Sequence, residues 1–140
     1  MTIKDFYTNL FLNFVCKYSP ELIEKARKVS SNPRQLIRTH IKQHLDYGTI
    51  TPYYEDGELV GLCNYDITDV TAHIKNCVVH PNYRHRDILK KIIRRGLQTW
   101  PFLQYIEFER SYKKDLRSRK ILISRILKTE HQGVLQNGIR

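Results

Sequence analysis

The spacing of apolar residues changes at Gly48, and this change constrains the fold more than any other feature of the 140-residue chain. Before Gly48, apolar side chains recur every three or four residues, which is typical of amphipathic helices. After Gly48, β-branched and aromatic residues gather in short segments bounded by turn signals, which is typical of strands. The order of these segments predicts an α/β or α+β domain in which helices pack on a sheet.

Helices are expected at residues 3–18, 21–29 and about 34–47. In the first, Phe6, Leu10, Phe14 and Val15 recur at helical spacing. Proline at a helix start and the sequence of residues 30–33, Ser-Ser-Asn-Pro, separate the second helix from its neighbours. The glycine at position 48 suits the end of the third helix.

Strands are expected at residues 49–55, 58–67, 71–79 and 105–109. Asp56-Gly57 is a hairpin turn signal, so the first three strands can form a meander. Between the third and fourth strands, residues 88–97 predict an amphipathic helix with an apolar stripe opposite basic residues. Residues 116–127 fit either a helix or a strand. If they form a helix, the sheet is truncated and its edge is available to a second copy, as in a homodimer.

The chain shows no internal repeat or linker, so one domain over residues 1–140 is expected. Its parts are a helical segment (1–48), a sheet segment (49–110), and a C-terminal element with a tail (111–140). The longest uncharged apolar run, Leu10 to Cys16, is too short to span a bilayer. No signal-peptide pattern is visible at the N-terminus, so a cytoplasmic protein without a membrane partner is expected.

The formal net charge of +10 is unevenly distributed, with six Lys or Arg residues between Arg84 and Arg95 and eight between Arg110 and Lys128. Such clusters favour an anionic partner: a polyanionic cofactor, a nucleic acid or an acidic protein. A solvated face explains them equally well. The three cysteines form no CxxC pair, and we interpret them as small buried apolar residues.

One segment carries a family resemblance. The string Cys77-Val78-Val79-His80-Pro81-Asn82-Tyr83-Arg84-His85-Arg86-Asp87-Ile88-Leu89 continues into the basic helix. It resembles the acetyl-CoA segment of the GNAT N-acetyltransferase superfamily, in which a strand leads through a His-Pro turn and a Tyr-Arg pair into a glycine-containing loop and a helix. The resemblance covers about residues 49–109. It implies a GNAT-like, mostly antiparallel mixed sheet with helices on both faces.

The resemblance also implies a function: transfer of an acetyl group from acetyl-CoA, as co-substrate, to a primary amine. The cofactor-binding residues that it implies are Val78, Val79, Arg84, His85, Arg86, Asp87, Ile88 and Leu89. Independently of the family, a helix N-terminus offers unpaired N–H groups and the positive end of the helix dipole to a pyrophosphate. Arginines beside it add charge-assisted hydrogen bonds.

The chain departs from the family pattern at the two small residues of the loop, which are Asp87 and Leu89 here. As an N-cap, the Asp87 carboxylate can occupy the amides that would hold phosphate. Its charge opposes a pyrophosphate by about 4 kcal/mol at 4 Å with an effective dielectric near 20. The alternative function is therefore a catalytically inactive, GNAT-like basic module that binds nucleic acid or an acidic protein.

The candidate catalytic residues are His73 and Tyr112. His73 lies where the histone-acetyltransferase branch has a carboxylate base, and histidine can act as a base near pH 7. Tyr112 is the nearest match to the family's tyrosine acid after the fifth strand. A solvent-facing histidine and a packing tyrosine are the structural alternatives. Asp66 and Asp69 are candidates to contact a cationic substrate, although loop capping also explains them.

No metal site is expected. His40 and His44 are four residues apart on a predicted helix, a spacing that can hold zinc. The first histidine has no glutamate after it and no third ligand is evident.

Overall fold

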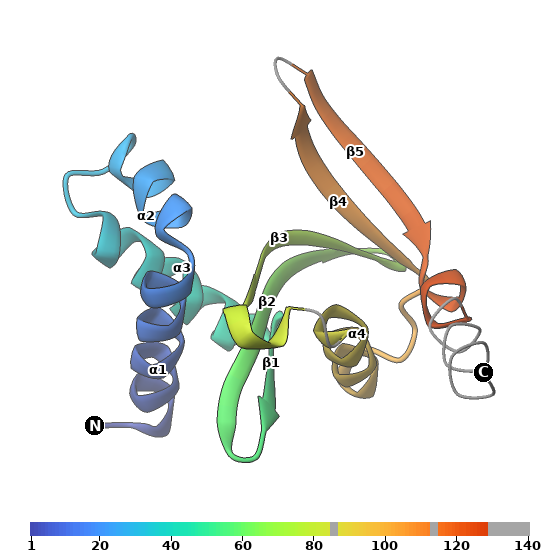
Figure 1. Ribbon diagram of the computed structural model, residues 1–140, viewed down its shortest axis with the longest axis horizontal. Helices are drawn as coiled ribbons and strands as arrows, with labels where there is room; N and C mark the ends of the chain where they lie inside the picture. The colour runs from blue at the N-terminus through green and yellow to red at the C-terminus, as the bar shows by residue number, and fades with distance from the viewer. Residues whose placement is uncertain (85–86, 113–114, 129–140) are drawn as a thin grey trace.

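Five strands form one mixed sheet in the order β1-β2-β3-β4-β5 in the computed structural model (Figure 1). The structure describes residues 1–84, 87–112 and 115–128, with the side chains of 109–112 and 115–118 left out. The strands are β1 (Ile50–Glu55), β2 (Glu58–Thr68), β3 (Thr71–Val79), β4 (Tyr105–Tyr112) and β5 (Asp115–Leu122). The predicted meander of β1, β2 and β3 is antiparallel, β3 and β4 are parallel, and β4 and β5 form an antiparallel hairpin.

Helices cover both faces of the sheet, as expected (Figure 1). The helices are α1 (Ile3–Tyr18), α2 (Pro20–Arg27), α3 (Pro33–Tyr47) and α4 (Ile88–Thr99), with a 3₁₀ turn, η1 (Pro81–Tyr83), before α4. One apolar cluster lies between α1, α3 and the sheet, and a second lies between α4 and the opposite face. Because β3 and β4 are parallel, α4 forms the crossover between them.

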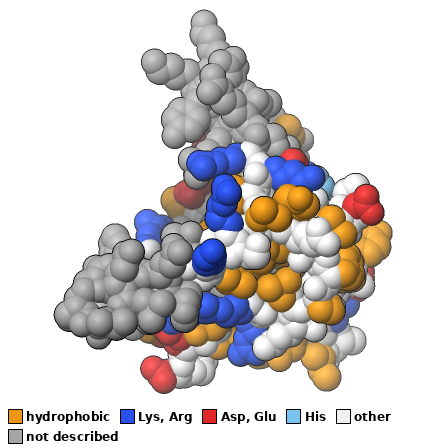
Figure 2. Space-filling model, turned by 90° about the vertical axis from the view of Figure 1, so that its right-hand side faces the viewer, with side chains coloured by type: hydrophobic (Ala, Val, Ile, Leu, Met, Phe, Trp, Pro, Cys, Tyr) orange, Lys and Arg blue, Asp and Glu red, His pale blue; other side chains and the backbone are white. Residues whose placement is uncertain are grey.

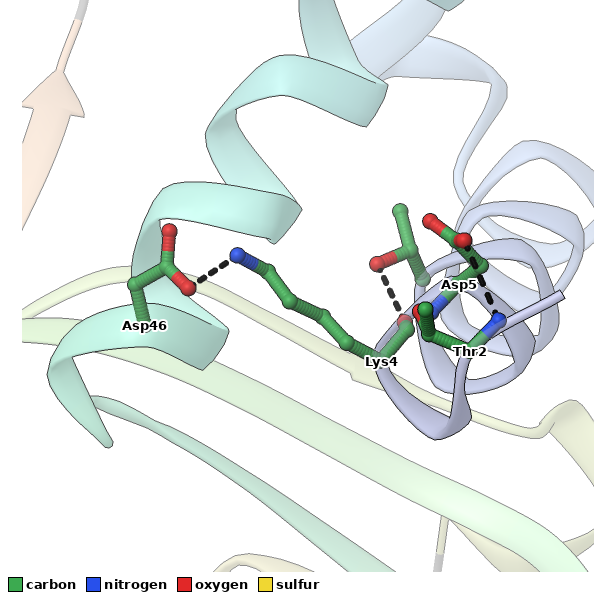
Figure 3. Close-up of polar contacts among 5 residues, drawn as sticks. Thr2, Lys4, Asp5 and Asp46 are labelled. Carbon is green, nitrogen blue, oxygen red and sulfur yellow. Dashed lines mark hydrogen bonds and ion pairs between the residues drawn. The ribbon is translucent and has the colours of Figure 1, made fainter.

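Local signals fix the ends of the first and third helices. The Thr2 hydroxyl accepts a hydrogen bond from the Asp5 amide, and the Asp5 carboxylate accepts one from the Thr2 amide, which forms a capping box at α1 (Figure 3). An ion pair between Lys4 and Asp46 connects α1 to α3. At the end of α3, Gly48 adopts a left-handed conformation with φ of 71°, which glycine reaches without steric cost.

Residues 116–127 combine both structures that their pattern fitted. β5 continues to Leu122, and residues 123–128 are helical. Ile121 therefore lies in β5, whereas Ile123 is the first helical residue and is buried in the apolar cluster that faces α4. The sheet is not truncated, because β5 pairs with β4 along its whole length.

The expected burial of the cysteines holds for only one of the three, and Phe6 of the first helix lies outside the core. Phe6 is 54% exposed and packs edge-to-face on Tyr7, because the buried face of α1 begins only at Thr8. Of the three cysteines, only Cys63 is buried; Cys16 is half-buried and Cys77 is exposed. Cys77 lies beyond the last β3–β4 pair, where β3 pairs with β2 alone among the described strands.

Candidate active site

A fork between two parallel strands is the main feature of the candidate site. β3 and β4 pair only from Thr71 to Ile74, opposite Tyr105 to Phe108. Beyond this point β3 continues along β2, while the β4–β5 hairpin projects away from it (Figure 1). Within the described chain, residues 75–79 of β3 therefore have a strand partner on one side only.

A β-bulge decides which groups of β3 reach the fork. Asn64 lies opposite Asn76, but Tyr65 lies opposite Ile74, so Lys75 is the extra residue. The bulge inverts the alternation of the strand. Ile74 packs toward α4, and Val78, an even number of residues further on, packs toward α1.

Backbone direction in this part of β3 follows from one hydrogen bond. The His80 N–H donates to the Val60 carbonyl at 2.8 Å. Because peptide groups alternate along a strand, the N–H and C=O of Val78 also face β2, whereas those of Cys77 and Val79 face the fork. Of the two valines predicted to bind the cofactor, Val79 directs its backbone N–H and C=O into the fork. Val78 is 6% exposed and packs in the core instead. Arg84 Nε donates to the Val79 carbonyl at 3.4 Å.

The His-Pro turn after β3 is held between two helical elements. The His80 ring lies 4.5 Å from the Tyr18 ring of α1 and 5.3 Å from the Tyr83 ring of η1. Its Nδ1 accepts a hydrogen bond from the Asn82 N–H at 3.1 Å. These contacts orient the chain as it passes from the fork to the start of α4.

Asp87 is the N-cap of α4 but does not cap with its side chain. It adopts a left-handed conformation with φ of 54°, and its exposed carboxylate lies 3.8 Å from Lys90 Nζ. The amides of Ile88 and Leu89 are in the first turn, where helical N–H groups have no partner within the helix. These N–H groups point out of the N-terminal end of α4, here called the helix mouth, while the side chains of Ile88 and Leu89 pack into the core. The predicted residues His85 and Arg86 lie outside the described residues.

His73 forms a dyad with a carboxylate immediately below the fork. Its Nδ1 lies 2.8 Å from Glu107 Oε1, and both side chains are about 30% exposed. Parallel pairing places Glu107 of β4 beside His73, and antiparallel pairing places Asp66 of β2 on its other side. Sequence reasoning missed Glu107, because nothing in a single sequence gives the register between β3 and β4. Tyr112 ends β4, and its side chain lies outside the described part of the structure.

A cavity of about 560 Å³ lies between the α1–α3 helices and the face of β2 and β3. Its floor is apolar, and the polar residues around it are Lys25, His40, Gln43, His44, Asn64, Asp66, Lys75 and Asn76. Asp66 is thus a cavity residue, and it pairs with Lys75 at 3.4 Å. Asp69 is not in the lining; it occupies a turn with φ of 59°.

Burial at the cavity wall lowers the pKa of His44, and the nearby Asp66 carboxylate opposes this effect in part. Its Nδ1 is 2.8 Å from the Thr49 hydroxyl. His40 and His44 both line the cavity, but the described residues contain no group of three or more His, Cys, Asp or Glu that could hold a metal ion.

The basic face of α4 is partly neutralised by its own neighbours. Lys91 Nζ lies 3.2 Å from Glu55 of β1 and also over the Tyr53 ring. Figure 2 shows Lys and Arg side chains interspersed with apolar ones on the face of the molecule that it presents. Among the described residues, no helix is both long and apolar enough to cross a membrane.

Comparisons with known proteins identify the family and the fold. The model of the acetyltransferase (GNAT) family matches residues 14–108, about two thirds of the chain. The PaiA N-acetyltransferase of Thermoplasma acidophilum, solved in complex with coenzyme A, shares the fold with a TM-score of 0.54 at 13% identity over 82% of this chain and 79% of that one.

Two further solved structures are similar at lower scores. A GNAT-family protein from Desulfovibrio desulfuricans has a TM-score of 0.44 at 13% identity, over 66% of this chain and 65% of its own. A mutant of the spermidine N-acetyltransferase SpeG from Vibrio cholerae has a TM-score of 0.43 at 15% identity, over 69% of this chain and 78% of its own. This chain thus spans just under two thirds of the Desulfovibrio protein. No curated protein matches the sequence.

Proposed function

This chain belongs to the acetyltransferase (GNAT) family, and we propose on that basis that it transfers an acetyl group from acetyl-CoA to a primary amine. The observation that carries the proposal is the fork between β3 and β4 beside the uncapped N-terminus of α4. The open backbone edge of β3 can form hydrogen bonds with an amide-containing arm. The N-terminus of α4 next to it can form hydrogen bonds with a diphosphate.

The residues at the fork fit coenzyme A. Val79 and Cys77 present peptide groups to an extended arm, in the manner of an added strand. At the helix mouth, the amides of Ile88 and Leu89 face the diphosphate, and the exposed Asp87 carboxylate does not occupy them. Lys90 lies beside this mouth and offsets the charge of Asp87, and Arg84 lies at the fork through its hydrogen bond to the Val79 carbonyl. Acetyl-CoA supplies the acetyl group as a thioester.

We assign the amine to the cavity on the other face of the fork strand. Lys75, Asn76 and Val78 form part of both the separated half of β3 and the cavity wall, so a molecule in the cavity lies close to the fork. Asp66 supplies a carboxylate that can attract an ammonium group before it loses its proton. The volume of about 560 Å³ suits a small molecule rather than a folded protein surface.

His73 acts as the base in this mechanism. With Nδ1–H donating to Glu107, Nε2 is the ring nitrogen that accepts the proton from the amine, directly or through water. The nitrogen forms a bond to the thioester carbonyl carbon, the carbon–sulfur bond breaks, and the thiolate takes a proton. Tyr112 remains the proposed donor of that proton. The orientation of the imidazole by Glu107 follows the logic of a base held by a third group.

Binding and turnover test the proposal separately. Calorimetry should detect coenzyme A binding, and ligand at one hundred times its Kd should stabilise the fold by about 2.7 kcal/mol, roughly 8 °C in Tm. A panel of primary amines incubated with acetyl-CoA should yield a product heavier by one acetyl group. Absence of heat and of a thermal shift at millimolar coenzyme A would exclude the enzyme function.

A further inference from the structure

Two cysteines lie directly opposite each other on neighbouring strands at the edge of the fork. Cys63 of β2 pairs in register with Cys77 of β3. Both side chains point to the α4 side of the sheet, and the two thiols are close enough to shift each other's pKa. The third cysteine, Cys16, is on α1, on the other side of the sheet.

The register allows a disulfide between them without backbone movement. His80 and Val60 form a hydrogen-bonded pair, so Cys77 and Cys63, three positions along, form a non-hydrogen-bonded pair. Cα atoms in such pairs are about 4.5 Å apart, and a disulfide spans about 4.4–6.8 Å between Cα atoms. Cross-strand geometry at this position is therefore within the range that the bond requires.

The two thiols differ in accessibility. Cys63 is 2% exposed and cannot meet a solute, whereas Cys77 is exposed on the uncovered edge of β3. Interaction with the Cys63 thiol lowers the pKa of the Cys77 thiol, and burial opposes this in part. The same interaction together with burial raises the pKa of Cys63 well above its usual value. Because the thiolate is the nucleophile, Cys77 is the residue that reacts first.

We propose that Cys77 is a thiol–disulfide exchange site for low-molecular-weight disulfides, and that Cys63 is its resolving cysteine. The Cys77 thiolate attacks one sulfur of the disulfide, forms a mixed disulfide and releases one thiolate. Cys63 then loses its proton and attacks the Cys77 sulfur, which forms the Cys63–Cys77 bond and releases the second thiolate. The external disulfide is reduced to two thiols, and the pair is oxidised.

The position of Cys77 favours coenzyme A disulfide among such reagents. Cys77 directs its peptide group into the fork, two residues before Val79, so an arm bound there carries its sulfur close to the Cys77 thiol. This preference rests on the proposed function, whereas the exchange itself does not. A bound reagent has a high effective concentration, so we expect coenzyme A disulfide to react about tenfold faster than glutathione disulfide at equal concentration.

Intact mass and peptide mapping of the full chain test the proposal. After treatment with either disulfide, the wild type should lose two hydrogens and yield a peptide that joins Cys63 to Cys77. Cys63→Ala should stop at the mixed disulfide on Cys77, because the second thiol is absent. Cys77→Ser should form neither product, and Cys16→Ser, the matched control, should behave as the wild type.

Three outcomes separate the two proposals. Equal rates for the two disulfides, with the internal bond still formed, would leave the exchange site standing and argue against coenzyme A at the fork. Coenzyme A binding by calorimetry without any Cys63–Cys77 bond would overturn the exchange site alone. An adduct on Cys16 in the folded wild type, or equal labelling of all three cysteines, would also overturn it. Circular dichroism of each variant establishes that it is folded.

Discussion

Asp87 holds a backbone conformation that glycine reaches without steric cost. Its φ of 54° is left-handed, and the other described non-glycine residues with positive φ are Asp56 and Asp69. Aspartate tolerates this region because its short polar side chain can hydrogen-bond locally, although an L-residue still pays roughly 1–2 kcal/mol there. The loop thus keeps the shape that a glycine would give it, and adds a negative charge.

Replacing Asp87 should tighten coenzyme A binding. Because the carboxylate is exposed and screened by solvent, Asp87→Asn should lower the Kd for coenzyme A by no more than about fivefold. This is much less than a repulsion of about 4 kcal/mol between the carboxylate and the diphosphate would give without that screening. Asp87→Gly should give the same gain and also raise the free energy of unfolding by about 1 kcal/mol. Titration calorimetry at low and high salt measures this, and the gain should shrink at high salt. Weaker binding by Asp87→Asn would mean that the carboxylate contacts the ligand.

Substitutions in the His73–Glu107 dyad should change the rate of acetyl transfer, whereas a substitution at Asp66 should change the binding of the amine. His73→Gln should reduce kcat for acetyl transfer by about 10²–10⁴ because it removes the base. Glu107→Gln should cost about tenfold in kcat with little change in KM, because it loosens the ring without removing it. Asp66→Asn is the comparison: it should raise KM for the amine and leave kcat nearly unchanged. Steady-state kinetics with both substrates varied would show this division, and an unchanged kcat for His73→Gln would remove His73 from the mechanism.

At the scale of elements, the packing of α4 on β2 sets the position of the helix mouth. A Cβ at Gly61 would meet Ile88 Cγ2 at 2.7 Å and Ile92 Cδ1 at 2.9 Å, closer than such atoms approach. Gly61 therefore lets the first turn of α4 lie against the sheet. Gly96, near the other end of α4, has only ordinary contacts around it, the nearest being Thr51 Oγ1 at 3.6 Å.

Gly61→Ala should destabilise the fold by about 1–3 kcal/mol and weaken coenzyme A binding, because it displaces the start of α4. Gly96→Ala is its matched control on the same helix–sheet contact. It should be neutral or stabilise the fold by up to about 1 kcal/mol, because alanine is the better helix former. Chemical denaturation of both variants gives the comparison, and a tolerated Gly61→Ala would refute the close packing at this point.

At the scale of the whole molecule, the cavity between the α1–α3 helices and the sheet links pH to stability. Burial lowers the pKa of His44 in the folded chain, so the unfolded chain binds more protons as the pH falls. The stability that neutral His44 contributes is present above the pKa of an unfolded histidine, about 6.5, and is lost progressively below it. His44 should therefore make the fold more acid-sensitive.

Thermal unfolding of the wild type should show a Tm that falls between about pH 7.5 and pH 5, and the fall should be smaller in His44→Gln. His40→Gln, on the same helix at an exposed position, removes only the smaller electrostatic contribution of His40 to the lowered pKa of His44, so its fall should lie between those of the wild type and His44→Gln. A steeper fall in His44→Gln than in the wild type would contradict the sign of the shift.

Local signals in the sequence predicted the helices and most strands to within a few residues. The glycine at position 48 and the Asp56-Gly57 turn each act over a few residues, so a single sequence contains them. The string from Val78 to Leu89 likewise predicted the family, because its residues are contiguous. The candidate cofactor-binding residues from Val78 to Leu89 were also found from the sequence, because they lie on one contiguous segment.

Contacts between distant segments were decided only by the tertiary structure. The bulge at Lys75 turned Val78 away from the fork and brought Cys77 to it, and the parallel register of β3 with β4 set Glu107 beside His73. Strand register depends on the packing of both faces of the sheet, and no local pattern specifies it. The sequence alone thus determined the elements and the type of site, whereas tertiary packing decided which side chains meet, because register is a property of two segments and not of one.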